Sequence, residues 1–208
     1  MRDLSPYLFL KDWLKKRRRA AHNGPLLRRQ KIKLVIGSGN TLYDGWVSTD
    51  RGEIDLLDED SFQRFLKEKT LTNVLSEHVF EHFSELDTLH VVRNIFSHLE
   101  PGGRLRVAVP DGYHCDPCYL DMVRPGGSGN GSDDHKVLYN MDTLGDLMRS
   151  AGFDVSVLEG FTRQGVFTAK PWSPEEGYVK RSVCFDKRNL LAPFTYSSLI
   201  LDGIKPAG

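Results

Sequence analysis

The residues best suited to chemistry in this chain stand directly after short apolar runs. Gly37-Ser38-Gly39 follows the run at 33–36, and glycines without side chains let a ligand approach the backbone closely. Asp50 follows the next apolar run, where a carboxylate can accept hydrogen bonds from both hydroxyls of a ribose. Together they indicate a nucleoside ligand. The dinucleotide fingerprint G-x-G-x-x-G is broken, because Leu42 stands at the third glycine position, and this argues against an NAD enzyme.

Candidate acid–base groups follow later apolar runs in the same way. An unperturbed imidazole titrates near pH ~6.5, so a histidine can take up or release a proton near neutrality. A carboxylate beside it, such as Glu77 beside His78, could orient the ring or bind a substrate. For each of these residues a surface or capping role is the alternative interpretation. The catalytic candidates are His78, Asp111, His114 and His135.

The segment His78-Val79-Phe80-Glu81-His82 also matches the H-x-x-E-H pattern of inverted zinc peptidases. Two imidazoles four residues apart would share one helix face, as a zinc site requires. The pattern belongs inside a helix, however, whereas this segment begins where a predicted strand ends. We therefore expect no metal ligands here and keep a zinc hydrolase only as an alternative.

The stretch Cys115-Asp116-Pro117-Cys118 is a C-x-x-C pair with His114 beside it. A structural zinc site needs four ligands, and only Cys184, His114 and the more distant His135 could complete one. The pair is best interpreted as two loop cysteines.

The elements that must position these residues alternate between strand and helix. Apolar run length and spacing predict strands at 33–36, 46–49, 54–57, 71–75, 105–109 and 153–158, and helices at 58–69, 86–99 and 141–151. This order predicts an α/β fold with a mostly parallel sheet, right-handed crossovers and helices on both faces. Residues 111–135 are predicted to form a long functional loop.

Composition narrows the class of protein further. The 208 residues are 39% hydrophobic and 27% charged, which are values of a globular chain rather than a disordered one. Three cysteines, an odd number, argue against a secreted disulfide framework and favour a reducing cytoplasm. No apolar run reaches the roughly 18 residues of a membrane span. We expect a basic arm at 1–32 and one domain at 33–208.

The zero net charge hides an asymmetry between that arm and the body. Residues 1–33 carry a net charge of +9 and the remainder −9. Such an arm could bind nucleic acid or an anionic surface. The favoured interpretation is a helix whose apolar side packs on the body while its cations stay solvated. That apolar side is Leu4, Leu8, Trp13 and Leu14.

Several segments together resemble a known family, the class I S-adenosylmethionine-dependent methyltransferases. More narrowly, they resemble a bacterial group of small predicted methyltransferases. The L-x-P-G-G-x-L element at 99–105 is the most specific of them, and the resemblance covers about residues 33–160. The other segments lie at 34–40, 45–50 and 75–82, with 109–114 and 133–139 typical of the bacterial group.

The resemblance implies a Rossmann-like fold, S-adenosylmethionine as cofactor and methyl transfer to a small-molecule or carbohydrate-like acceptor. Gly37 and Gly39 would lie beneath the methionine part, and Asp50 would hold the ribose. Asp55 with the Leu56 amide would meet the adenine edge, and residues 76–78 would flank the sulfonium. The implied cofactor-binding residues are Gly37, Ser38, Gly39, Asp50, Asp55, Leu56, Ser76 and Glu77.

Two positions depart from the family pattern. Val35 stands where the family has an acid that organises the cofactor's ammonium end. Asp50 and Asp55 lie too close in sequence for the usual helix between the second and third strands, so we expect a fold shortened at that point. A non-catalytic nucleoside-binding module of the same fold remains the alternative function.

Overall fold

The computed structural model describes residues 6–190 and 196–208. The strands are β1 (Lys31–Ile36), β2 (Trp46–Ser48), β3 (Thr70–Glu77), β4 (Leu99–Pro110), β5 (Asp154–Phe161), β6 (Phe167–Ala169) and β7 (Ser198–Ile204). The α-helices are α1 (Pro6–Leu26), α2 (Glu59–Leu66), α3 (Glu85–His98), α4 (Pro117–Val123) and α5 (Met141–Ser150). Short 3₁₀ turns are η1 (Phe80–His82), η2 (Ser132–Asp134), η3 (Pro174–Glu176) and η4 (Lys187–Leu190).

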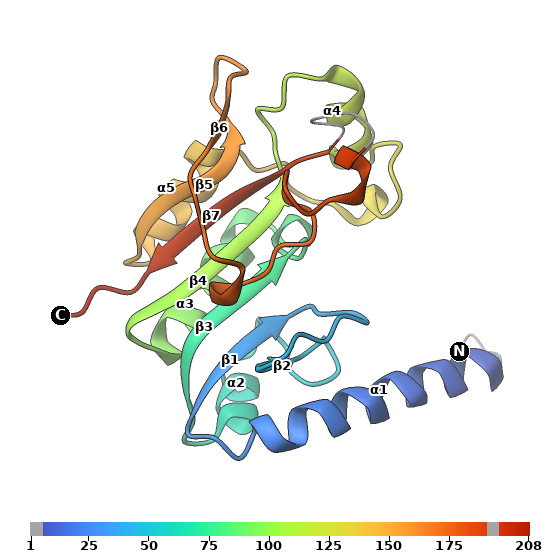
Figure 1. Cartoon of the computed structure of the whole chain (residues 1–208), viewed down its shortest axis with the longest axis vertical. Coiled ribbons are helices and arrows are strands. Elements are labelled where there is room, and N and C mark those ends of the chain that lie inside the picture. Colours follow the sequence, from blue (N-terminus) through green and yellow to red (C-terminus); the bar gives the residue numbers. More distant parts are fainter. Residues whose placement is uncertain (1–5, 191–195) are drawn as a thin grey trace.

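The described strands form one seven-stranded sheet in the order β2-β1-β3-β4-β7-β5-β6. The pairs from β2 to β4 are parallel, whereas β7 runs antiparallel to both β4 and β5, and β6 antiparallel to β5. The α/β prediction is confirmed. Because β1 to β4 run in one direction, their carboxyl ends meet at the same edge of the sheet, as Figure 1 shows.

The two faces of the sheet are covered differently. Alternation along β1 sends Leu34 and Ile36 to one face and Val35 to the other. Helices α2, α3 and α5 bury the first face through residues such as Phe62, and a fully buried core results. Where helices were expected on the second face, the chain from 171 to 186 covers it as coil with one 3₁₀ turn.

A buried ion pair attaches that coil to the sheet. Arg106 on β4 is 0% exposed and donates from Nε and Nη2 to both carboxylate oxygens of Asp202 on β7, at 2.7 and 2.8 Å. Its remaining Nη1 donates to the carbonyl oxygens of Ser173 and Gly177. The guanidinium also lies 4.8 Å from the Trp172 ring centroid. A fully bonded charge pair of this kind pins an irregular segment in place.

The short strand predicted at 54–57 is wrong. Residues 51–57 form turns without strand pairing, and the Asp55 side chain accepts the Leu57 N–H at 3.1 Å in a local turn. Such short-range bonding competes with strand formation. The fold was expected to lack only the helix before a third strand at 54–57. The structure lacks that strand as well, and β2 is the edge of the sheet.

Helix α1 occupies the place beside that edge, as Figure 1 shows. The buried Asn23 side chain accepts the Ser48 N–H at 2.9 Å and donates to the Ser48 carbonyl at 2.8 Å. One amide side chain thus supplies the pair of hydrogen bonds that a neighbouring strand would make. This blunts an edge strand that would otherwise stay open.

The predicted packing of this helix is wrong. Trp13 and Leu14 are 43% and 52% exposed, and the buried side chains facing the body include Arg19 and Asn23. The hydrogen bonds of Arg19 and Asn23 to the sheet edge, rather than burial of apolar side chains, determine which face of α1 packs on the body. Leu4 lies outside the described residues, as does the side chain of Leu8. Within 6–190 and 196–208, no helix combines the length and apolar character needed to cross a bilayer.

The predicted loop at 111–135 is partly helical. Asp116 caps α4 by accepting the Cys118 N–H at 2.8 Å, and Pro117 occupies the first helical turn. Cys115 and Cys118 are free, exposed thiols beside this start.

Replacing Asn23 with alanine is expected to lower the free energy of unfolding by about 1–3 kcal/mol, because it leaves the buried Ser48 backbone groups without partners. Urea denaturation measures the loss, and faster amide exchange at Ser48 locates it. Arg18→Ala, on the exposed side of the same helix, is the control and should change stability little. Equal losses in the two variants would contradict the edge role of Asn23.

Candidate active site

The turn after β1 forms an open glycine cradle. Gly37 has φ +62° and Gly39 φ +55°, conformations that favour glycine. A Cβ at Gly37 would collide with the Val79 side chain, whereas a Cβ at Gly39 would meet no atom within 4 Å. The buried Ser38 between them donates its N–H to Thr49 O at 2.9 Å, and its hydroxyl has no partner among the described residues. Gly39 therefore borders space that a ligand can fill.

The carboxylate of Asp50, at the end of β2, is already in contact with a cation. Arg19 from α1 lies 3.3 Å from Asp50 Oδ2 and 2.5 Å from Glu53 Oε2, and it donates to Gly39 O at 2.7 Å. The Asp50 side chain still keeps 41% of its surface exposed. Asp50 Oδ1 accepts the Arg51 N–H at 2.9 Å, so Asp50 stands beside the cradle with a partner on each oxygen and part of its surface exposed.

Sequence reasoning missed Arg19 and Glu53. Arg19 belongs to a run of similar cations from Lys15 to Arg19, and no local pattern distinguishes the buried one. Arg19 lies four residues before Asn23, so the two side chains share one helix face. Both bond to residues at the sheet edge, and this spacing was the one signal in the sequence.

The predicted adenine-side residues lie in the turn that replaces the third strand. Asp55 is exposed, and its N–H donates to Ser61 Oγ at 2.9 Å, while Leu56 is buried. Asp55 borders an open, polar cavity of about 440 Å³ that Glu53, Asp58 and Arg64 also line.

The end of β3 carries the third group of predicted residues. Ser76 is fully buried with a hydroxyl that has no partner in the described structure. Glu77 accepts the Arg181 N–H at 2.8 Å. His78 has φ +55°, which costs energy in a residue with a Cβ and marks a held position. Its Nδ1 lies 2.9 Å from Glu81 Oε1 and its Nε2 3.0 Å from Ser198 Oγ. The Nε2 contact is a hydrogen bond, and the Nδ1 contact is a close approach to the carboxylate.

Glu81 is the buried acid of this region. Burial would raise its pKa, but the neighbouring His78 more than offsets this, and the pKa of Glu81 lies below its usual range. The zinc-peptidase alternative is not supported, since residues 80–82 form a 3₁₀ turn and His78 turns toward β7 rather than toward His82.

Asp111 is buried and bonded to backbone groups of two segments, while its catalytic role stays a prediction. Its buried carboxylate accepts the Phe161 N–H at 2.7 Å and the Tyr113 N–H at 2.9 Å. Burial raises the pKa of Asp111 to about 6, although these two hydrogen bonds act in the opposite direction. The side chain ties the end of β5 to the start of the 111–135 segment.

His114 is buried in an aromatic stack, and its catalytic role stays a prediction. Its ring stacks on Tyr119 with centroids 3.9 Å apart and lies 4.5 Å from the Phe161 ring. Burial lowers the pKa of His114, and nearby Asp116 partly opposes this. The ring is 5% exposed, so no substrate reaches it in this arrangement.

His135 lies apart from that stack and close to η1. Its half-buried ring stands 5.0 Å from the His82 ring, and its Nδ1 lies 2.7 Å from Val123 O. The structure thus divides the four catalytic candidates into two pairs, His78 and His135 near Glu81, and Asp111 and His114 beside Tyr119. His78 lies near the β3 end and His135 near His82, while Asp111 and His114 are buried between loop and sheet.

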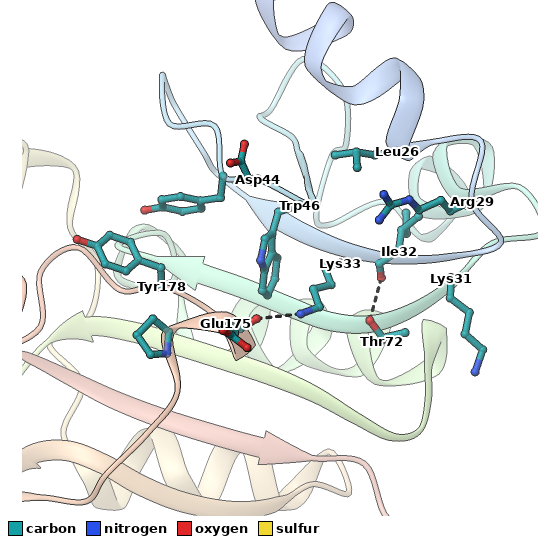
Figure 2. Close-up of a pocket in the computed structure, with 13 residues that line it drawn as sticks. Leu26, Arg29, Lys31, Ile32, Lys33, Asp44, Trp46, Thr72, Glu175 and Tyr178 are labelled. Atoms are coloured by element: carbon teal, nitrogen blue, oxygen red, sulfur yellow. Dashed lines mark hydrogen bonds between the residues drawn. The ribbon is translucent and has the colours of Figure 1, made fainter.

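Another cavity lies at the amino-terminal ends of β1 and β2. Figure 2 shows its lining, with Trp46 and Tyr178 on one side and Lys33 reaching Glu175 O at 2.8 Å. Its volume is about 530 Å³. Because ligands of parallel sheets bind at the opposite, carboxyl ends, this cavity is not the predicted cofactor site.

Comparison with known proteins gives structural relatives only. No family model and no curated protein sequence matches the chain. An O-methyltransferase family protein from Burkholderia thailandensis is similar at TM-score 0.50 and 12% identity, over 94% of this chain and 57% of that one. The methyltransferase SibL is similar at TM-score 0.48 and 16% identity, over 96% of this chain and 57% of that one. A SAM dependent methyltransferase from Archaeoglobus fulgidus is similar at TM-score 0.46 and 17% identity, over 93% of this chain and 92% of that one.

The chain has a Rossmann-like methyltransferase fold. It spans little more than half the length of SibL and of the B. thailandensis protein. The Gly39 cradle, Asp50 and Ser76 lie at the carboxyl ends of the parallel strands β1, β2 and β3. Membership of the small bacterial group stays a prediction.

The buried Asp111 predicts a pH-dependent stability. Its folded-state pKa of about 6 exceeds the ordinary 3.8, so between these values the folded state binds more protons than the unfolded state. The free energy of unfolding therefore falls as pH rises from 4 to 6, by about 2 kcal/mol relative to Asp111→Asn. Urea denaturation of both proteins across this range measures the difference. A difference that does not change with pH would contradict the raised pKa.

Proposed function

We propose that the chain is an S-adenosylmethionine-dependent methyltransferase acting on a small-molecule or carbohydrate-like acceptor. The observation that carries the proposal is the open cradle at Gly39, with the exposed side of Asp50 next to it on the following strand. The methyltransferase fold supports the same function. A small Rossmann-like sheet with these groups at its carboxyl edge suits a nucleoside cofactor.

The residues at the cradle fit that cofactor. The hydroxyls of Ser38 and Ser76 are buried and lack partners among the described residues, and buried polar groups are normally hydrogen-bonded. A polar ligand in the cradle would supply the missing partners. Asp50 and the Gly39 backbone, held together by Arg19, would receive the ribose and methionine parts.

Methyl transfer makes modest demands on the protein. S-adenosylmethionine, when bound, supplies an activated methyl group, which leaves sulfur as the acceptor's nucleophile bonds to it. The chain has to align that nucleophile and exclude water. His78, in contact with Glu81 and Ser198, braces the β3 end beside the cradle. The segment at 111–135, held by Asp111, would border the acceptor and set selectivity.

Asp50→Asn is expected to weaken S-adenosylhomocysteine binding by about 1–3 kcal/mol, because the amide cannot accept charge-assisted hydrogen bonds from the ribose as a carboxylate does. Isothermal titration calorimetry measures the change. Asp44→Asn alters an acid at the opposite end of the sheet and is the matched control. Unchanged affinity in the Asp50 variant would remove this residue from the site.

Gly39→Asn tests the cradle while sparing the fold. Asparagine tolerates the left-handed conformation, and its side chain would enter the open space. Binding of S-adenosylmethionine should be lost, with little change in the urea denaturation midpoint. Gly102→Asn, with φ +79° and no neighbouring atoms, is the control at the amino-terminal end of the sheet. Retained binding by folded Gly39→Asn would contradict the cradle.

Turnover separates an enzyme from a binding module. Wild-type protein that binds S-adenosylmethionine is incubated with a panel of hydroxylated and amino acceptors, and S-adenosylhomocysteine release is measured. Release that depends on an acceptor supports the methyltransferase. Tight binding with no release across sugars, sugar nucleotides and small phenols would favour the non-catalytic module.

A further inference from the structure

The 3₁₀ turn after β3 and the end of the 111–135 segment bring three metal-ligating side chains together. We propose that Glu81, His82 and His135 form a binding site for one divalent transition-metal ion of the Zn²⁺ type. One ligand atom from each residue lies within 4.8 Å of the other two. The three residues come from segments more than 50 positions apart in the sequence, so folding assembles the site.

Glu81 supplies the strongest indication. Its side chain is 1% exposed, and neither carboxylate oxygen has a hydrogen-bond partner of good geometry among the described residues. The near contact with His78 Nδ1 involves Oε1 alone, which leaves Oε2 unmet. A carboxylate oxygen buried without a partner is costly. A cation beside His82 and His135 would satisfy it.

His135 is oriented as a metal ligand should be. Its Nδ1 lies 2.7 Å from Val123 O, and a carbonyl can only accept, so Nδ1 carries the hydrogen. In the neutral ring the lone pair is then on Nε2. Metal-binding histidines commonly have their other nitrogen fixed by a carbonyl or carboxylate in this way. The Val123 carbonyl thus sets both the tautomer and the direction of the ring.

The backbone holds the ligand segments in place before any ion arrives. The Glu81 carbonyl accepts the Lys136 N–H at 2.7 Å and the Val137 N–H at 3.3 Å. His82 Nδ1 also lies 3.3 Å from Asp134 O, next to His135 in the chain. The site therefore needs little rearrangement, which lowers the entropic cost of binding.

Two imidazoles and one carboxylate are a ligand set that suits Zn²⁺ and neighbouring first-row ions. Three protein ligands leave a fourth position for water or a substrate oxygen, the arrangement of catalytic rather than structural zinc sites. His82 is 33% exposed, so that position can face solvent. An ion there would also tie the end of the 111–135 segment to the turn that follows His78.

The experiment is a Co²⁺ titration of the tag-free full chain, followed by displacement with Zn²⁺. Co²⁺ bound by these ligands gives visible absorption bands that the aqueous ion lacks. We expect one Co²⁺ per chain, displaced by one Zn²⁺. Removing one ligand, in His135→Gln or His82→Gln, should weaken binding on the order of 100-fold, since even outer-shell changes cost 10–100-fold.

The control is His90→Gln on α3, an exposed histidine outside the cluster, which should bind like the wild type. Glu81→Gln is included only if its far-ultraviolet spectrum matches the wild type, and the two histidine variants decide the question otherwise. No visible bands with wild-type protein, or equal weakening in His90→Gln, would overturn the proposal. Because the titration needs no S-adenosylmethionine, its outcome is independent of the methyltransferase proposal.

Discussion

The structure depends on two sharp turns at neighbouring strand ends. Gly37 after β1 and His78 after β3 both adopt positive φ, and the Val79 side chain lies so close to Gly37 that no Cβ fits between them. Gly39, beside the first turn, has no atom within 4 Å of its Cβ position, and Glu81 lies just after the second turn in contact with His78. His78 carries conformational strain, and its contacts to Glu81 and Ser198 hold it there. Both candidate sites follow from these turns.

Most of the fold could be predicted because its elements have strong local patterns. Apolar runs located β1, β3 and β4, and spacing on one face located α3 and α5. The strand at 54–57 failed because Asp55 forms a side-chain turn that competes with pairing. The predicted burial of Trp13 failed for a different reason. Arg19 and Asn23 bond to polar groups far away in the sequence, and these bonds turn Trp13 outward despite the apolar pattern. Such partners are invisible until the sheet edge exists.

The site was predictable to the level of strand ends and no further. Gly39, Asp50 and Ser76 stand after the expected strands because parallel topology brings those ends together. The roles of single histidines were not predictable. His114 lies in an aromatic stack with Tyr119, and only the folded 111–135 segment decides that. The cluster of Glu81 and His135 arises from a loop return that no spacing rule encodes.

The hydrogen bonds of Asn23 limit how the β2 edge of the sheet can pair with strands of other chains. A strand with an unmatched row of amides recruits any other strand that comes near, and short parallel sheets are exposed to this during folding. The side-chain amide of Asn23, on a helix, hydrogen-bonds the Ser48 backbone groups at the β2 edge. A further strand therefore cannot pair with them on that side. The β2 side of the sheet can therefore end after three residues without presenting free Ser48 backbone groups to another chain.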